Sequence, residues 1–318
     1  MTADTHVGAE LRHPIGAKGR FILRVPSGEV RITGTDSPDA VVRERNGRDL
    51  SERFEIGARD GVLELVARQR FGITISIDNH VWGRGTPSLD IEVPARADVI
   101  VHTASADIAA TNLVGDKEFR TASGDLVFDA CAGELDLDAV SGDVRIDAVG
   151  AVDLHGKTIS GDLRIRAPRL DRFDLATTSG DVWLDAELAG KGPFSLKSIS
   201  GDVLLVARGG FQVEAQSITG DLSSEVPSRR ESFPGKKLLS IGRSGPTLNF
   251  KSVSGDFRVV EPRDQQVKDT MTDSDRATTD FADRPGAAGP TTASPAADPD
   301  GSPSRAILRA RERGEIAV

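Results

Sequence analysis

The stretch Val140-Ser141-Gly142-Asp143-Val144-Arg145-Ile146-Asp147 contains the motif that decides the fold of this chain. Its Ser-Gly-Asp triplet occurs seven times, once with Thr in place of Ser, and most copies lie 18 or 19 residues apart. A degenerate copy, Ser105-Ala106-Asp107, precedes them at the same spacing. Self-similarity at a fixed period is typical of a solenoid, in which each repeat buries its apolar face against its neighbours.

The Gly and Asp residues of the triplets form a predicted structural turn motif. Its members are Gly124, Asp125, Gly142, Asp143, Gly161, Asp162, Gly180, Asp181, Gly201, Asp202, Gly220, Asp221, Gly255 and Asp256. Gly tolerates the positive φ that a tight corner requires, and Asp can accept hydrogen bonds from turn N–H groups. A calcium ladder, as in some β-rolls, is the alternative, but such sites need several carboxylates per ion and each turn here offers one. The sequence favours structural turns.

Alignment of the repeats on the triplet places apolar residues in columns that alternate with polar ones. The column two positions after the central residue reads Ile108, Leu126, Val144, Leu163, Val182, Val203, Leu222 and Phe257, and the column seven before it reads Val99, Lys117, Leu135, Leu154, Phe173, Phe194, Val213 and Leu248. This alternation has the β period of two. Each repeat is therefore predicted to supply two short strands with one face inward.

A hairpin meander could share this alternation, but a parallel coil explains the columns better. In a parallel coil, equivalent residues stack directly, about 4.8 Å apart, which suits Phe173 on Phe194 and Ile146 on Ile165. A column of small, mostly hydroxyl residues such as Thr158 and Ser198 precedes each triplet and could form hydrogen bonds along a ladder where the coil bends. We predict an all-β fold, a parallel β-helix (β-solenoid).

The repeats resemble the bacterial "putative adhesin" family, a β-strand-repeat domain of unknown function. The resemblance rests on Thr121-Ala-Ser-Gly-Asp125, Thr178-Ser-Gly-Asp181, Val253-Ser-Gly-Asp256 and the entry strand Val25–Gly34, and it covers residues 18 to 262. It implies a single-stranded, right-handed parallel β-helix. Some relatives are associated with envelope-stress responses, which suggests a context for this chain.

The domain organisation follows from where the period begins and ends. We expect a flexible N-terminus over 1–17, an N-terminal β-strand cap and first coils over 18–94, and a solenoid of about eight repeats over 95–262 with an insertion at 226–246. Residues 263–303 are rich in Pro, Gly, Ser and Asp and read as a disordered linker. Residues 304–318 read as a short helical segment that is either a vestige or a working module.

Composition restricts the classes of function. The formal net charge is −9, and the pI is near 5.2, so nucleic-acid binding is not expected. No apolar run is long enough for a transmembrane segment and no secretory signal is visible, so we expect a cytoplasmic protein, with association to the envelope through a partner as the alternative. Cys131 is the sole cysteine and cannot form an internal disulfide. Five scattered His residues show no metal-ligand spacing, and no cofactor motif occurs, so a small-molecule ligand is not expected.

Two features favour a protein partner. Alternation assigns the apolar side chains of Trp183, Leu204 and Val206 to the outside of adjacent coils, where exposed apolar patches indicate a cover or a partner. The insertion carries a basic cluster that includes Arg229, Arg230, Lys236 and Lys237; a loop packed on the coil is the simpler interpretation. We therefore expect a non-catalytic scaffold or protein-interaction module. A β-helix-type carbohydrate-active enzyme and a self-assembling, adhesin-like protein are the alternatives, the former because charged residues such as Arg145, Arg164 and Asp185 line an outer face.

Overall fold

The computed structural model describes residues 8–68 and 86–262, which form an all-β solenoid with one short helix. The expected linker, the C-terminal helical segment and the first seven residues lie outside the described residues, as does the apolar run Ile73–Ile77. Within the described part of the chain, no helix has both the length and the apolar character needed to cross a membrane.

Twenty strands and one helix make up the described residues. The elements before the first triplet are β1 (Glu10–Pro14), β2 (Arg20–Thr35), β3 (Asp39–Glu44), α1 (Leu50–Arg53), β4 (Phe54–Arg59), β5 (Val62–Ala67), β6 (Ser88–Pro94) and β7 (Asp98–Thr111). The repeats form β8 (Lys117–Ser123), β9 (Leu126–Ala139), β10 (Val144–Thr158), β11 (Leu163–Thr177), β12 (Val182–Leu188), β13 (Phe194–Ser198), β14 (Val203–Val206), β15 (Phe211–Ser217) and β16 (Leu222–Ser224). The last strands are β17 (Ser228–Phe233), β18 (Lys236–Ile241), β19 (Thr247–Ser252) and β20 (Phe257–Val260).

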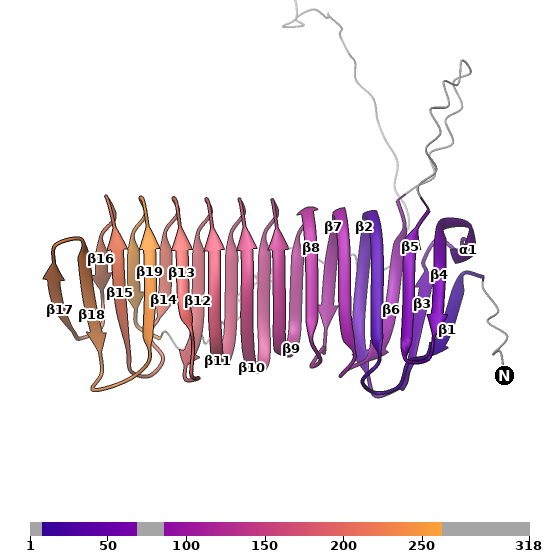
Figure 1. Cartoon of the computed structure of the whole chain (residues 1–318), viewed down its shortest axis with the longest axis horizontal. Coiled ribbons are helices and arrows are strands. Elements are labelled where there is room, and N and C mark those ends of the chain that lie inside the picture. The colour runs from indigo at the N-terminus through magenta and orange to yellow at the C-terminus, as the bar shows by residue number, and fades with distance from the viewer. Residues whose placement is uncertain (1–7, 69–85, 263–318) are drawn as a thin grey trace, which may run out of the picture. The chain divides into compact units, whose positions relative to one another are not determined.

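Equivalent residues of successive repeats stack directly, so the coil is parallel and not a meander. Ile146 pairs with Ile165, and Phe173 pairs with Phe194, as the columns predicted. Figure 1 shows the strands side by side along one axis. The inward columns form one continuous buried core, in which each large apolar side chain contributes about 1.5–3 kcal/mol.

The triplet corner is a close backbone contact between coils. Gly161 has φ 113°, and a Cβ on it would lie 2.1 Å from the carbonyl oxygen of Gly142 in the coil before. Gly142 and Gly180 have the same conformation and the same close contact with the preceding coil. Any side chain at these positions would push two coils apart, so the corner requires glycine on both conformational and steric grounds.

The last repeat does not stack at the end of the solenoid, contrary to the simple sequential order of the columns. Strand β19 pairs with β13 on one side and β15 on the other, and β20 lies likewise between β14 and β16. The chain therefore leaves the coil of β13 and β14, builds the terminal coil of β15 and β16, and returns to fill the level between them. The insertion forms the hairpin β17–β18, and β18 extends the terminal coil by antiparallel pairing with β15.

The N-terminal end is interleaved in the same way. Strand β2 pairs with β7 on one side and with β5 and β6 on the other, although β5 and β6 follow β2 in the sequence. Beyond them, β4 pairs with β5 and β3 with β6, both antiparallel. Part of the segment expected to be flexible is also ordered: Glu10–Pro14 forms β1, which pairs with β3 because Leu11 is fully buried in the core.

The side chains of the small hydroxyl column form hydrogen bonds within one coil and not between coils. The side chains of Thr158 and Ser198 donate to the carbonyl oxygens of Ser160 and Ser200, two residues further along the same corner. Bonds between coils come instead from the serine of the triplet, as when Ser160 Oγ donates to the carbonyl oxygen of Val140. The expected ladder exists, but a neighbouring column supplies it.

One buried cation interrupts the apolar interior. Lys117 is 3% exposed, and its Nζ donates to the carbonyl oxygens of Gly115 and Ala132, each at 2.5 Å. Burial lowers the pKa of Lys117 to about 8, against the ordinary lysine value of 10.5.

Replacing a corner glycine should destabilise the fold strongly. We expect Gly161→Ala to lower the free energy of unfolding by about 3 kcal/mol or more, because the positive φ and the contact with Gly142 both oppose a side chain. Gly57→Ala is the matched control, since its Cβ would have only ordinary contacts, at 3.7 Å and beyond. Urea unfolding measures both variants, and equal effects would contradict the proposed constraint.

The buried lysine should make stability depend on pH. Between pH about 8 and 10.5 the unfolded chain holds a proton on Lys117 that the folded chain does not, so raising the pH across this window should favour folding. The free energy of unfolding of the wild type relative to Lys117→Met should rise by about 3 kcal/mol over the window. A difference that stays constant in urea titrations at several pH values would show that the ammonium has an ordinary pKa.

Candidate functional site

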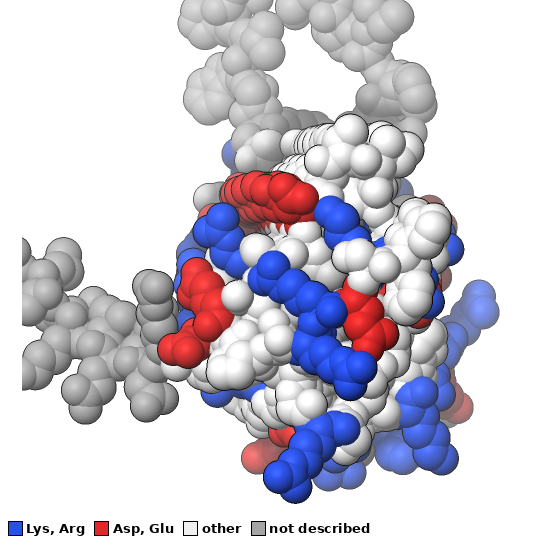
Figure 2. All heavy atoms as spheres, turned by 90° about the vertical axis from the view of Figure 1, so that its left-hand side faces the viewer, with Lys and Arg blue, Asp and Glu red and all other residues white. Residues whose placement is uncertain are grey.

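The aspartates of the triplets form a continuous ladder along the solenoid. In stacking order they are Asp107, Asp125, Asp143, Asp162, Asp181, Asp202, Asp256 and Asp221. Except at the last residue, Asp221, each Oδ1 accepts a hydrogen bond from the backbone N–H of the next Asp, with N···O distances of 2.8 to 3.1 Å. Figure 2 shows the resulting row of exposed acidic groups, beside an uncharged ridge.

The ladder ends at a lysine of the insertion. The Nζ of Lys237 donates to Asp221 Oδ1 at 3.2 Å and to the carbonyl oxygen of Gly220 at 3.0 Å. The last carboxylate, which has no further coil to accept from, therefore meets an ammonium group. Because Oδ1 of every carboxylate already accepts a protein donor, the geometry favours the structural interpretation of these aspartates over the calcium ladder.

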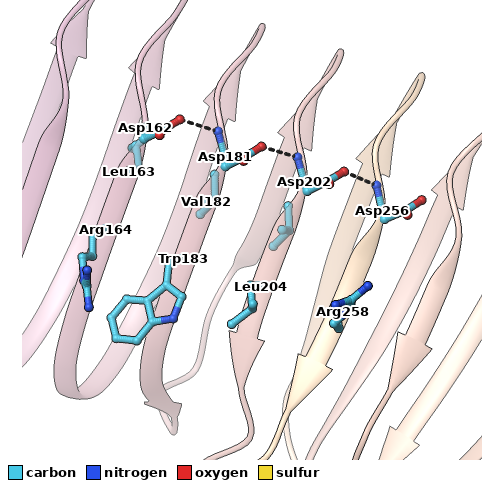
Figure 3. Close-up of a pocket in the computed structure, with 11 residues that line it drawn as sticks. Asp162, Leu163, Arg164, Asp181, Val182, Trp183, Asp202, Leu204, Asp256 and Arg258 are labelled. Carbon is cyan, nitrogen blue, oxygen red and sulfur yellow. Dashed lines mark hydrogen bonds between the residues drawn. The ribbon is translucent and has the colours of Figure 1, made fainter. Parts of the chain in front are cut away.

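A groove of about 450 Å³ lies beside the ladder on the outer face. Its floor is one outward column, Arg164, Trp183, Leu204 and Arg258, contributed by β11, β12, β14 and β20 in that stacking order. Four ladder residues, Asp162, Asp181, Asp202 and Asp256, form its rim (Figure 3). The structure thus brings Trp183 and Leu204 together as half-buried neighbours, as the columns predicted.

The tryptophan is held by guanidinium groups. The Cζ atom of Arg164 lies 4.6 Å from the centroid of the Trp183 ring, and that of Arg166 lies 5.6 Å from it. Such cation–π contacts orient the indole and contribute about 0.5–1 kcal/mol at exposed sites. The groove therefore has an apolar floor, Trp183 and Leu204, between Arg164 and Arg258, and an acidic rim.

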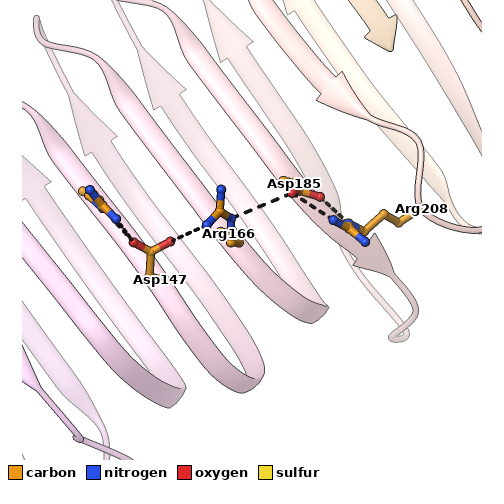
Figure 4. Close-up of polar contacts among 5 residues, drawn as sticks. Asp147, Arg166, Asp185 and Arg208 are labelled. Carbon is orange, nitrogen blue, oxygen red and sulfur yellow. Dashed lines mark hydrogen bonds and ion pairs between the residues drawn. The ribbon is translucent and has the colours of Figure 1, made fainter. Parts of the chain in front are cut away.

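Val206 lies in an outward column but does not belong to this exposed patch, because its side chain is buried. It is 6% exposed and pairs with Asp185, which is also only 6% exposed. Arg208 covers this position by a bidentate ion pair with Asp185, in which Nη2 lies 3.0 Å from Oδ2. Arg166 continues the row to Asp147, with ion-pair distances of 3.9 Å to Asp185 and to Asp147 (Figure 4). This network covers the outward column at the end of the strand.

The basic cluster of the insertion lies away from the groove. Lys236 pairs with Glu214 at 2.7 Å and Lys237 ends the ladder, while Arg229 pairs with Glu231 within β17. Arg230 is exposed on the same strand, which pairs only with β18 among the described residues. Charged side chains on such an edge oppose pairing with another chain. The hairpin extends the side of the coil that contains β15, so it does not cover Trp183 or Leu204.

Sequence reasoning missed Arg258 as a neighbour of Leu204. The two residues share a column, but their repeats are not consecutive, so their contact depends on the interleaved order of the last coil. The intervening insertion, which makes one repeat 35 residues long, is the only signal in the sequence that the order changes there.

The ladder hydrogen bond and the ladder charge can be separated by substitution. We expect Asp202→Ala to lower the free energy of unfolding by about 1 kcal/mol, because the N–H of Asp256 loses its acceptor. Asp202→Asn should keep the acceptor and remove repulsion from Asp181 and Asp256, so it should stabilise at low salt and have little effect at high salt. Urea unfolding at two salt concentrations tests this, with Asp60→Asn in an exposed turn as the control. Equal losses for Ala and Asn would contradict the ladder's role.

Comparison with solved structures gives relatives of low sequence identity. A putative adhesin from Bacteroides fragilis aligns with 80% of this chain and 97% of its own, at 11% identity and a TM-score of 0.39. Putative adhesins from Parabacteroides distasonis and Parabacteroides merdae align with 80% and 81% of this chain and 97% of their own, both at 13% identity, with TM-scores of 0.28 and 0.25. No curated protein matches the sequence.

A family model described as Toastrack DUF4097 matches residues 21–260. The match begins in β2 and ends with β20, so it includes the triplet repeats, both interleaved ends and every residue of the groove. This protein belongs to the Toastrack DUF4097 family, a domain family of unknown function.

Proposed function

We propose that this chain is a non-catalytic scaffold that binds a protein partner through the groove around Trp183 and Leu204. The observation that carries the proposal is the pair itself: two large apolar side chains on adjacent coils, half-buried, in an outward column that is elsewhere mostly polar. Tryptophan and arginine are the side chains most enriched at the centres of protein interfaces. Both occur in this groove.

The rim indicates what kind of segment the groove binds. An apolar side chain of the partner fits over Trp183 and Leu204, and basic groups of the partner fit against Asp181 and Asp202. The rigid ladder holds these carboxylates in place before binding, which lowers the entropic cost of association. The context we propose is regulatory, in the bacterial envelope-stress response, because the family resemblance suggests it.

The ends of the solenoid support the role of a soluble scaffold. We propose that the antiparallel strands at the N-terminal end act as a cap, as the hairpin β17–β18 does at the other end, because solenoids need polar terminal elements for solubility. We also infer a right-handed coil, since parallel crossovers are almost always right-handed.

Truncation of the tryptophan should separate binding from folding. We expect Trp183→Ala to weaken partner binding by about 2 kcal/mol or more, as for a hot-spot residue, with little change in melting temperature because the side chain is half-exposed. Val127→Ala is the matched control, because Val127 is 39% exposed in the same outward column, outside the groove. Quantitative capture from native cells identifies proteins held by wild type and control but not by the variant, and titration with the purified protein then measures affinity. Equal capture by all three would refute the groove as the binding site.

A further inference from the structure

A second surface, which shares the acidic ladder with the groove, runs along the triplet corners. The residue immediately before each triplet from Ser141 onward points outward, and in stacking order this column reads Val140, Ile159, Thr178, Ile199, Val253 and Ile218. Its aliphatic members are 47 to 79% exposed. Five of the nine large apolar side chains that are exposed in the described part of the chain belong to this ridge. Such concentration, as opposed to single scattered residues, indicates an interaction surface.

The backbone beneath the ridge is locked in register. The N–H groups of Ser160, Ser179, Ser200 and Ser254 each donate, at 2.9 Å, to the carbonyl oxygen of a residue in the preceding coil of the ridge. The side chains therefore stand one above another at the strand spacing, over about 24 Å from the first to the last of the six levels. A partner would meet a preformed row and would not need to order it.

Opposite charges flank the ridge. The acidic ladder runs along one side, three residues after each ridge position. On the other side, two residues before Ile159, Ile199 and Val253, stand the exposed side chains of Lys157, Lys197 and Lys251. Among the described residues these three lysines form no ion pair, and the ladder carboxylates on the same coils, Asp162, Asp202 and Asp256, have no basic partner. The surface is thus a basic row of three lysines, an apolar ridge and an acidic row, in parallel. The column of the lysines also contains Asp138, Ala176 and Gln216, and Asp138 pairs with Arg120.

We propose that this surface binds a second copy of the chain, side by side and parallel, about a two-fold axis that runs along the solenoid. This rotation sets ridge against ridge and places the basic row of each copy opposite the acidic row of the other. Lys157 then faces Asp162 of the second copy, and Lys197 faces Asp202 of the second copy, on the same coil. The antiparallel arrangement would set like charges against each other, so complementarity selects the parallel one.

The dimensions set the strength of this contact. A stable interface buries about 800 Å² on each partner, and a single convex ridge of six levels covers less. The dimer is therefore weak and reversible, and its rows of exposed charge make it sensitive to salt. It leaves Trp183 and Leu204 outside the contact, although the acidic row of the dimer is also the rim of the groove.

Sedimentation equilibrium of the full chain over a concentration series tests the proposal. Wild type should self-associate at low salt and less at high salt. Ile159→Ser with Ile199→Ser should weaken association about tenfold, whereas Val149→Ser, at a 68% exposed valine outside the ridge, should not change it. Trp183→Ala should also leave it unchanged, which separates this test from that of the groove. A wild type that stays monomeric overturns the proposal, as does an unchanged ridge variant.

Charge variants test the complementarity. Two triple variants should each associate more weakly than wild type. The first combines Lys157→Glu, Lys197→Glu and Lys251→Glu, and the second combines Asp162→Asn, Asp202→Asn and Asp256→Asn. The asparagines keep the ladder acceptors, so the second variant should remain folded, as circular dichroism can show. Mixing the two variants should give more dimer than either alone, since lysines of one then meet carboxylates of the other. No gain on mixing would contradict the pairing of the rows.

Single cysteines test the orientation. In the parallel arrangement every ridge position faces itself, so Val140→Cys, Ile159→Cys and Ile199→Cys should each form a symmetric disulfide under mild oxidation with diamide. Val149→Cys is the control and should not cross-link. Failure of Val140→Cys and Ile199→Cys to cross-link to themselves would overturn the parallel two-fold arrangement. A monomeric wild type whose ridge variants lose a different protein from cells would assign the ridge to a foreign partner instead.

Discussion

The close approach of backbones at the Ser-Gly-Asp corner is the constraint on which the rest of the structure depends. There a glycine of one coil lies directly over the carbonyl of the coil before it, with no room for a side chain. This contact fixes the register of every following strand, and a register shift of one residue would exchange the inward and outward faces. The buried columns, the acidic ladder, the groove and the aliphatic ridge all follow from the register that the corner sets.

A row of eight carboxylates at strand spacing would seem a poor choice for stability, since like charges opposite each other repel. The corner makes the row tolerable in three ways. Seven of the carboxylates accept an amide N–H, all eight are exposed to solvent that screens their neighbours, and the eighth, Asp221, meets the ammonium of Lys237. The same aspartate side chains therefore accept the hydrogen bonds of the corner N–H groups and give this face its negative charge.

The sequence predicted most of the fold and two of the three residues of the apolar patch, and the failures share a cause. Periodicity shows which residues are equivalent, so it predicted Phe173 on Phe194 and Trp183 beside Leu204. It does not show which coil lies next to which, so it could not place the last repeat between two earlier ones or bring Arg258 beside Leu204. Alternation also did not predict the burial of Val206, which arises because an arginine from the next loop covers its neighbour Asp185 and buries the end of the outward column. Such coverage depends on long side chains of other segments, and the alternation of inward and outward residues along one strand contains no information about them.

The interleaved ends limit how such a chain can change its length during evolution. In a simple solenoid, duplication of a terminal repeat adds a coil at no cost to the rest. Here β19 lies between β13 and β15 at one end, and β2 lies between β5 and β7 at the other. A repeat duplicated at either end would therefore separate strands that pair with each other. Repeats can be gained or lost only in the uniform middle, between β8 and β12, where each coil meets its sequence neighbours on both sides. Relatives of different length should therefore differ in the number of middle coils and share both ends.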